Sequence, residues 1–394
     1  MSEIAWEITS LSELGTFSRG KSKHRPRNDV KLFEGGKYPL VQTGDVKAAN
    51  LYITKNDSYY NDFGLKQSKL WPAGTLCITI AANIAETAIL SYPMCFPDSI
   101  VGFNANPEKS SELFVYYFFE YIKKEIQKSA SGSIQDNINI DYLSKMRIKV
   151  PEKKYQDKIV ELLSSIDKKI LLNNQINQEL KAMAKTLYDY WFVQFDFPDQ
   201  NGNPYKSSGG KMVYNPDLKR EIPEGWGVSK VGELQIATGK RDANFGTENG
   251  QYNFWTTANS PIKADEFSFE GKAILIAGNG NFYVNFTEGK FEAYQRTYVI
   301  QSEDENMLIF MYMACLQSVE KLRKGSNGSI IKYITIGDVN NIASPYNKKV
   351  VDEFVRIYSP LINLISKNKR QNQELIQLRD WLLPMLINGQ VRVE

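Results

Sequence analysis

The chain has 394 residues, of which 42% are hydrophobic and 24% charged, so it is long enough for two or three globular domains. With three scattered cysteines and a single histidine, His24, it lacks the ligands of a histidine-rich metal site, and we expect free, reduced thiols. The net charge of +3 neither demands nor excludes nucleic acid. No signal peptide and no apolar run of roughly 20 residues is present, so we expect a cytoplasmic protein.

An internal repeat of about half the chain organises the sequence. A segment that begins at Trp6 and ends in the Gly-Lys pair at 20–21 returns from Trp226 to the Gly-Lys pair at 239–240. Strand-like runs cover residues 76–81 in the first half and 273–277 and 298–300 in the second, and a helical pattern covers residues 113–127. This alternation of short strands and helices predicts a mixed α/β fold for each half.

Each half closes with a long helical pattern, over residues 156–191 and 350–388. Apolar residues recur in both at alternating steps of four and three, the spacing of a heptad seam, with an interruption near Asn173 and another near Asn368. Such seams cannot remain in water, and each is the natural partner of the other. We therefore predict an antiparallel coiled coil that relates the two halves by a pseudo-two-fold axis.

The predicted order is module, helix, linker, module, helix. Gly, Pro, Asn and Ser dominate the stretch between the halves, which is typical of a linker or a long surface loop. The predicted boundaries are 1–152 for the first module, 153–195 for the first helix, 196–222 for the linker, 223–348 for the second module and 349–394 for the second helix and C-terminal tail.

Residues 15–22, GTFSRGKS, match the nucleotide-binding pattern GxxxxGK[ST]. A phosphate-binding loop needs a buried strand before it and a helix that opens at its Lys-Ser. Here a polar segment precedes the match, Pro26 and a charge run follow it, and the second half lacks the spaced glycine. A chance match is the favoured interpretation, and a P-loop ATPase is kept as an alternative.

A basic run covers residues 19–27, and Lys240 and Arg241 occupy the same place in the second half. These cations suit contacts to DNA phosphates, and turn residues with amide, hydroxyl and guanidinium groups suit contacts to base edges. A solvated loop and ordinary turn capping are the simpler explanations. The candidate contacts in the first half are Arg19, Lys21, Lys23, Arg25, Arg27, Gln42, Thr43, Asn83, Ser131, Ser133 and Gln135. Those in the second half are Lys240, Arg241, Thr256, Thr257, Asn279, Asn281, Arg296, Lys324, Ser326, Asn327, Ser329 and Lys332.

Residues 188–195, YDYWFVQF, place aromatic side chains all round the end of the first long helix. One intramolecular seam cannot cover so many of them. Either a second protein or the chain's own module packs against this segment.

Several motifs follow one another along nearly the whole chain. They are the duplicated segments that start at Trp6 and Trp226, the Ile-Pro-Glu-Gly lead-in at 222–225, Asp98-Ser-Ile-Val-Gly, Ser131-Gly-Ser-Ile-Gln, Asn177-Gln-Glu-Leu, Asp189-Tyr-Trp-Phe and the C-terminal Leu-Leu-Pro-Met-Leu-Ile-Asn-Gly-Gln390. In these motifs the sequence resembles the specificity subunit of type I restriction–modification enzymes.

The resemblance implies two α/β target-recognition domains in a pseudo-two-fold arrangement, separated by two long antiparallel coiled-coil helices. Each domain would read one half of a split target in the major groove of double-stranded DNA, and the helices would set the gap and dock methyltransferase subunits. It implies no catalytic residue, cofactor or metal in this chain. Two adenine-methylating subunits would bind S-adenosylmethionine, and restriction subunits that join through them would bind ATP and magnesium. A coiled-coil scaffold that binds only proteins remains the other alternative.

Overall fold

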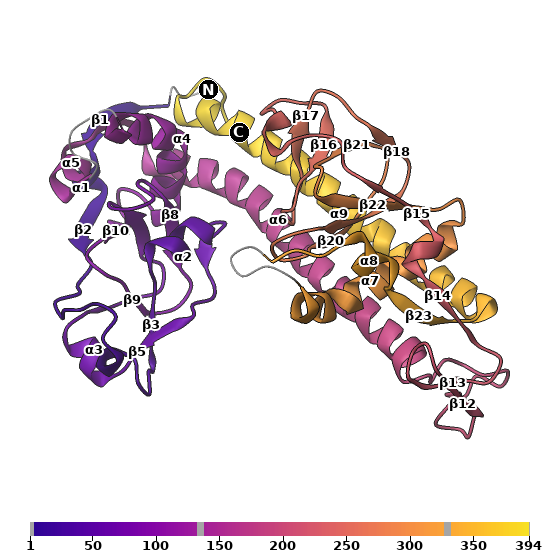
Figure 1. Ribbon diagram of the computed structural model, residues 1–394. Coiled ribbons are helices and arrows are strands. Elements are labelled where there is room, and N and C mark those ends of the chain that lie inside the picture. Colours follow the sequence, from indigo (N-terminus) through magenta and orange to yellow (C-terminus); the bar gives the residue numbers. More distant parts are fainter. Residues whose placement is uncertain (1–3, 132–137, 327–331, 394) are drawn as a thin grey trace. The chain divides into compact units, whose positions relative to one another are not determined.

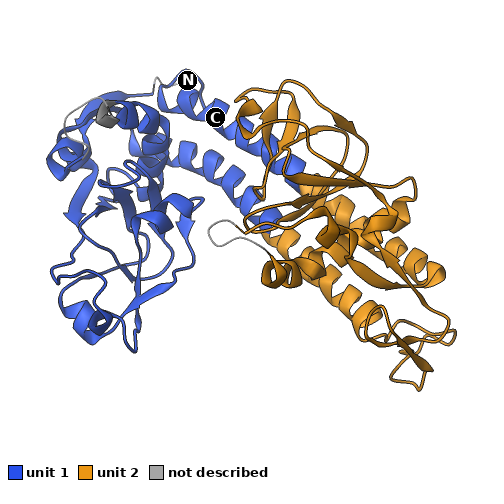
Figure 2. Cartoon of the chain, in the orientation of Figure 1, with its two compact units in different colours: residues 1–174, 369–394 blue, residues 175–368 orange. Residues whose placement is uncertain are grey.

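The computed structural model describes residues 4–131, 138–326 and 332–393, which form two compact units (Figure 1). Unit 1 comprises residues 1–174 and 369–394, and unit 2 comprises residues 175–368 (Figure 2). Each unit therefore holds one end of each long helix together with one α/β module. No helix in the described part of the chain is long and apolar enough to cross a membrane.

Two sheets form the module of unit 1. One has the strand order β2-β10-β7-β8-β4, the other has the order β5-β3-β9-β6, and β1 pairs with β11 alone. The strands are β1 (Trp6–Ser10), β2 (Gly15–Arg19), β3 (Tyr38–Leu40), β4 (Tyr52–Ile53), β5 (Ser58–Tyr60), β6 (Leu70–Trp71), β7 (Leu76–Thr79), β8 (Thr87–Leu90), β9 (Met94–Cys95), β10 (Ile100–Ala105) and β11 (Arg147–Pro151). The helices are α1 (Leu11–Leu14), η1 (Val30–Leu32), α2 (Thr43–Ala48), α3 (Asp62–Lys66), α4 (Glu112–Ser131) and α5 (Ile140–Lys145).

The predicted strand at 76–81 and the predicted helix at 113–127 are both confirmed. The strand is β7, which is buried along its whole length because both its faces are covered. The helix is α4, which contacts β7, β8 and β10 with a run of buried aromatic side chains that includes Phe114, Tyr117 and Phe119. This packing supplies the core of the first module.

The module of unit 2 repeats this plan. One sheet has the order β15-β22-β19-β20, the other has the order β17-β16-β21-β18, and β14 pairs with β23 alone. The strands are β14 (Gly227–Lys230), β15 (Gln235–Thr238), β16 (Tyr252–Trp255), β17 (Ile262–Ala264), β18 (Phe269–Glu270), β19 (Ala273–Ala277), β20 (Val284–Thr287), β21 (Lys290–Ala293), β22 (Thr297–Gln301) and β23 (Ala343–Tyr346). The helical elements are η3 (Val231–Glu233), η4 (Ala243–Phe245), α7 (Glu305–Gly325) and α8 (Ile336–Asn340).

The duplication seen in the sequence is a duplication of topology. The central antiparallel ladder β2-β10-β7-β8 corresponds to β15-β22-β19-β20. In the smaller sheets the parallel pair β3·β9 corresponds to the parallel pair β16·β21. Similar strand order, including a parallel pair at the same place in the smaller sheets, makes the two modules variants of one fold.

The long helices are α6 (Lys153–Tyr188), which continues as a π-helical turn η2 (Asp189–Val193), and α9 (Lys348–Ile387). The patterns at 156–191 and 350–388 predicted both. Within unit 1 the side chains of Asp167 and Asn173 on α6 meet Arg379 and Asn372 on α9, so the two helix ends run antiparallel. Within unit 2, Asn177 meets Asn368.

The predicted interruption of the heptad seam is wrong. Asn173, Asn177, Asn368 and Asn372 are all buried and occupy consecutive seam positions, so the alternating four and three steps continue through them. Each asparagine amide bonds to another across the helix pair, for example Asn173 Nδ2 to Asn372 Oδ1 at 2.8 Å and Asn368 Nδ2 to Asn177 Oδ1 at 2.9 Å. An apolar pattern cannot detect seam positions that are filled by paired amides.

The aromatic segment 188–195 packs onto the chain's own module. Tyr188, Trp191, Phe192 and Phe195 are buried in the core of unit 2, so the chain's own module covers these four side chains, while Tyr190 and Val193 stay exposed. The stretch 196–222 is also folded onto unit 2. It includes β12 (Met212–Asn215), which pairs with β13 (Arg220–Pro223) at its end.

Candidate nucleic-acid interface

The basic segment of unit 1 leaves β2 and runs along the turn between β9 and β10. The N–H of Gly20 donates to the carbonyl of Ile100 at 2.8 Å, and the N–H of Lys21 donates to the carbonyl of Phe96 at 3.1 Å. A Cβ on Gly20 would lie 2.0 Å from the carbonyl oxygen of Pro97. Only glycine fits where two backbones approach so closely, and the segment is held in place by main-chain bonds.

The second Gly-Lys pair makes the same contacts in unit 2. The N–H of Gly239 donates to the carbonyl of Thr297 at 2.9 Å, and that of Lys240 donates to the carbonyl of Ala293 at 3.0 Å. A Cβ on Gly239 would lie 2.1 Å from the carbonyl oxygen of Tyr294. The repeated Gly-Lys is therefore a packing requirement that presents a lysine beside the same turn in each module.

The P-loop alternative is wrong. Residues 15–19 form the strand β2 at the edge of its sheet, and no helix opens at Lys21 or Ser22. Without a strand–loop–helix unit, no array of helix N-terminal N–H groups faces a phosphate. The match of residues 15–22 to the nucleotide-binding pattern is a chance match of sequence.

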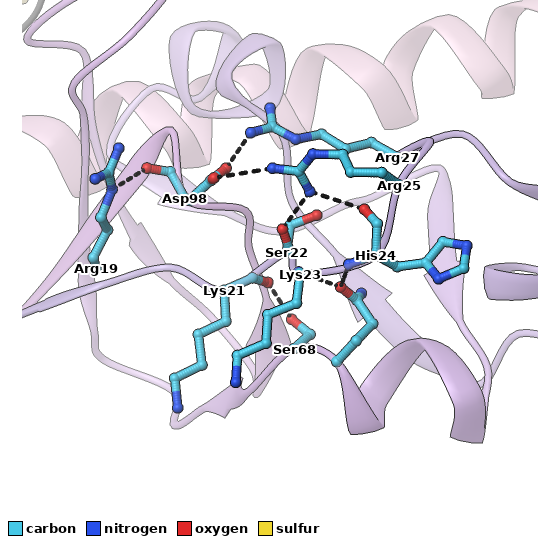
Figure 3. Close-up of polar contacts among 10 residues, drawn as sticks. Arg19, Lys21, Ser22, Lys23, His24, Arg25, Arg27, Ser68 and Asp98 are labelled. Atoms are coloured by element: carbon cyan, nitrogen blue, oxygen red, sulfur yellow. Dashed lines mark hydrogen bonds and ion pairs between the residues drawn. The ribbon is translucent and has the colours of Figure 1, made fainter.

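The side chains of the basic segment fall into two groups (Figure 3). Arg25 and Arg27 form ion pairs with Asp98, and Arg19 Nε donates to the backbone carbonyl of Asp98 at 2.7 Å. Lys21 and Lys23 are exposed, point away from Asp98 in this view, and form no ion pair with any described residue. The two lysines are thus available to an outside anion, whereas the arginines already have a partner.

A glutamine side chain also holds the backbone of the basic segment. The Oε1 atom of Gln67, just after α3, accepts from the N–H groups of Lys23 at 2.7 Å and His24 at 3.1 Å. His24 Nε2 lies 2.8 Å from Asp29 Oδ2. This hydrogen bond from His24, followed by the N–H of Lys31, lowers the pKa of Asp29.

The remaining candidates of unit 1 lie at turns near β7 and β8. Gln42 and Thr43 are at the start of α2, which contacts both strands, and Gln42 is exposed. Asn83 is exposed on the turn between the strands, at φ +47°, and its Oδ1 accepts from Lys47 Nζ at 3.2 Å. The side chains of Ser131, Ser133 and Gln135 lie outside the described residues.

In unit 2 the two cations after Gly239 behave differently. Lys240 is exposed, with its Nζ 5.3 Å from the ring centroid of Phe269. Arg241 pairs with Glu266 at 2.5 Å and with the fully buried Glu292 at 3.3 Å. Arg241 is therefore occupied with neutralising a buried carboxylate, and Lys240 is the freer cation.

Three turns of unit 2 come together next to this loop. The N–H of Gly278 donates to the carbonyl of Arg296 at 2.7 Å, and the N–H of Gly280 donates to the carbonyl of Lys332 at 2.9 Å. These bonds gather the exposed or half-buried candidates Asn279, Asn281, Arg296 and Lys332 from three separate segments. Lys324 and Ser326 lie at the end of α7, Thr256 and Thr257 follow β16, and Asn327 and Ser329 are outside the described residues.

The described residues contain no group of three or more His, Cys, Asp or Glu side chains able to hold a metal ion. The three cysteines are buried, which raises the pKa of Cys95 to about 11 and raises the pKa values of Cys77 and Cys315 still further. Thiols of this kind are poor nucleophiles.

The comparison with known families decides between the remaining alternatives. A model of the type I restriction–modification DNA specificity domain matches residues 3–182 and 223–377, which is most of the chain. The chain belongs to this family. It is a DNA-recognition specificity subunit, and the two matched segments correspond to its two modules with their helices.

Known relatives agree with this assignment. The chain is 26% identical over 422 residues to the type I restriction enzyme MjaIX specificity subunit of Methanocaldococcus jannaschii, covering 99% of this chain and 94% of the relative. It is 33% identical over 186 residues to the EcoDI specificity subunit of Escherichia coli, covering 44% of this chain and 40% of the relative. A crystal structure of a type I S subunit from M. genitalium has the same fold, with a TM-score of 0.60 and 16% identity over 98% of this chain and 97% of that one.

Two acidic residues of this specificity subunit escaped the sequence argument. Asp98 and Glu292 each hold arginines of the basic loops, from turns and strands far along the chain. Contacts to DNA call for donors and cations, so the sequence carries no signal for the acidic partners of those cations. The Asp98-Ser motif marked the position but not its role.

Proposed function

We propose that this specificity subunit directs partner subunits to a split, asymmetric DNA target, with the module of unit 1 reading one half and that of unit 2 the other. The observation that supports the proposal most is the duplicated loop: in each module a Gly-Lys pair is bonded to the same turn and presents an exposed lysine. Fixed basic loops provide phosphate contacts, and the turns beside them provide base contacts in the major groove.

The proposed contacts keep the predicted residues, weighted by what their side chains do. Lys21, Lys23 and Lys240 are the first choices for phosphates because they have no carboxylate partner among the described residues. Asn279, Asn281 and Arg296 are first choices for base edges in unit 2. Arg241 ranks below them, since a DNA contact would compete with its two ion pairs.

The energetics suit two weak readers better than one strong one. A good bidentate base contact contributes about 1–3 kcal/mol of discrimination. A few such contacts in each module, added across one chain, reach the roughly 4–10 kcal/mol that separates specific from non-specific binding. A net charge of only +3 indicates that partner subunits contribute further phosphate contacts.

The chain would itself be non-catalytic and without cofactor. Two adenine methyltransferase subunits, which bind S-adenosylmethionine, would dock on the paired helices, whose length would set the unread gap. Restriction subunits that use ATP and magnesium would join through them, in the cytoplasm. The exposed Met183 and Leu378, which occupy corresponding positions in α6 and α9, support a docking surface on each helix.

The test is a module exchange read by methylation. Long-read methylome sequencing of the native strain, with and without this gene, should lose one gapped, asymmetric adenine-methylation motif. Replacing residues 1–152 by the corresponding module of a relative should then change only one half of that motif. If both halves change, or neither, the proposal of two independent readers is wrong. A protein-only scaffold would leave the methylome unaltered by any module exchange.

A further inference from the structure

Asp98 is the meeting point of the three arginines of the basic segment. Its Oδ1 lies 2.5 Å from Arg27 Nη2, its Oδ2 lies 3.6 Å from Arg25 Nη2, and its backbone carbonyl accepts from Arg19 (Figure 3). The carboxylate is about a quarter exposed, at 28%, while both paired arginines are at least half exposed. A single carboxylate therefore faces two guanidinium groups that are open to solvent.

This cluster is held more firmly than ordinary surface ion pairs, which contribute about 0–1 kcal/mol each. The Nη1 atom of Arg25 also donates to the carbonyls of Ser22 at 2.5 Å and His24 at 2.8 Å, so three acceptors fix one guanidinium. The backbone below it is bonded to Gln67 and to the β9–β10 turn without any help from the Asp98 side chain. Neutralising Asp98 would thus change the charge and freedom of the arginines and leave the loop backbone in place.

In the second module, other residues hold the arginine of the basic loop. Matching the backbone bonds of the two turns places Phe96 opposite Ala293 and Ile100 opposite Thr297, so Asp98 corresponds to Gln295. Gln295 has no charge to offer, and the arginine of that loop is held instead by Glu292 and Glu266. The cluster around Asp98 therefore belongs to the first module alone.

We propose that Asp98 is a specificity-determining residue of the first module. It holds Arg25 and Arg27 in one orientation and withholds their charge from the phosphates of non-target DNA. Lys21 and Lys23 supply the sequence-independent attraction. An arginine that must leave a carboxylate gains little from a phosphate, whereas an oriented guanidinium next to a base edge discriminates between bases. This inference rests on the proposed function and names how one half of the target is selected.

The experiment compares Asp98→Asn with wild type in the full chain. Binding to a duplex with the methylome-derived target and to a non-target duplex is measured by fluorescence anisotropy at several salt concentrations. We expect tighter binding to non-target DNA, with the slope of log K against log salt steeper by about 0.9 for each arginine that gains a phosphate, and by about 1.8 if both do. The ratio of target to non-target affinity should fall by about tenfold or more.

A matched control removes a carboxylate from another surface ion pair. Asp157 pairs with Lys153 at the start of α6 and is 53% exposed, so Asp157→Asn makes the same change of charge away from the loop. It should leave the affinity ratio and the salt slope at their wild-type values. The methylome of the Asp98→Asn strain should in turn show relaxed sequence in one half of the motif only.

A second variant protects the test against a folding defect. Arg25→Gln with Arg27→Gln should relax the same half of the motif without any gain in non-target affinity. An unchanged affinity ratio and salt slope in Asp98→Asn, or a change no larger than that of Asp157→Asn, would overturn the inference. The double variant Lys21→Ala with Lys23→Ala distinguishes failure of this inference from failure of the proposed function. If it weakens binding to both duplexes while Asp98→Asn does nothing, only this inference fails. If wild type shows no preference for the target duplex, either alone or with its methyltransferase subunits bound, the proposed function fails.

Discussion

A buried ion pair in unit 1 gives the sharpest prediction about stability. Arg379 Nη1 on α9 lies 2.8 Å from Asp167 Oδ1 on α6, and Asp167 Oδ2 accepts from the hydroxyl of Tyr117 on α4 at 2.6 Å. The side chain of Asp167 is only 7% exposed, and that of Arg379 is 25% exposed. This triad ties both long helices to the first module.

Arg379→Ala leaves the Asp167 carboxylate buried with a single neutral donor. Removing one partner of a buried pair costs about 3–5 kcal/mol, and the partial exposure of Arg379 moves the expected loss to about 2–3 kcal/mol. For a unit of this size that loss lowers Tm by about 4–12 °C. Asp167→Asn in the same background should recover at least about 1 kcal/mol, because the amide still accepts from Tyr117 and needs no counter-charge.

Urea unfolding followed by circular dichroism, run as a double-mutant cycle, measures these losses. The control is Asp380→Asn: Asp380 also pairs with Arg379, at 2.9 Å, but is 58% exposed, so its loss should cost less than about 0.5 kcal/mol. The reasoning is refuted if Arg379→Ala costs no more than this control, or if the effects at Arg379 and Asp167 simply add.

Three further outcomes are expected. Gly20→Ala should displace the basic loop, cost about 1–3 kcal/mol and weaken DNA binding, whereas Gly227→Ala, with open space around its Cβ, should do neither in the same binding and unfolding assays. Arg241→Ala should destabilise unit 2 by about 2–3 kcal/mol in thermal unfolding, because it leaves the buried carboxylate of Glu292 without its counter-charge and bonded only to the Ser268 hydroxyl and the Ala293 N–H. Because the folded-state pKa of Asp29 is lowered, its stabilising contribution is full above the usual carboxyl pKa near 4 and is lost as the pH falls through the folded value. The urea midpoint of wild type should therefore exceed that of Asp29→Asn at pH 7, and the two midpoints should converge at pH 3.

Much of the fold could be predicted because it depends on local patterns. The long helices were predicted at 156–191 and 350–388 and lie at Lys153–Tyr188 and Lys348–Ile387, since helical periodicity is a property of neighbouring residues. The strand at 273–277 was predicted at its observed bounds from five consecutive apolar residues. The duplicated order of segments predicted the duplicated topology.

The candidate site was predicted less completely. The position of the loops followed from the repeated Gly-Lys, but not the reason for the glycines, which is a backbone carbonyl about 2 Å from where a Cβ would be. Which cations are free also depends on distant partners: Asp98 for the arginines near it and Glu292 for Arg241. Nothing in a nine-residue basic run distinguishes a paired arginine from an unpaired lysine.

The sequence by itself determined what repeats, where the long helices and a few of the strands lie, and which family the motifs resemble, because each of these is written in residues close together along the chain. Only the tertiary structure decided where side chains go once segments meet. It placed four asparagines in an unbroken helical seam, and it buried Tyr188, Trp191, Phe192 and Phe195 in the chain's own module. It also filled the positions that correspond to Asp167 and Arg379 with the buried Ile362 and Ala184 in the other unit. Such choices depend on pairing across more than a hundred residues, where burial and partner chemistry, rather than local pattern, set the free energy.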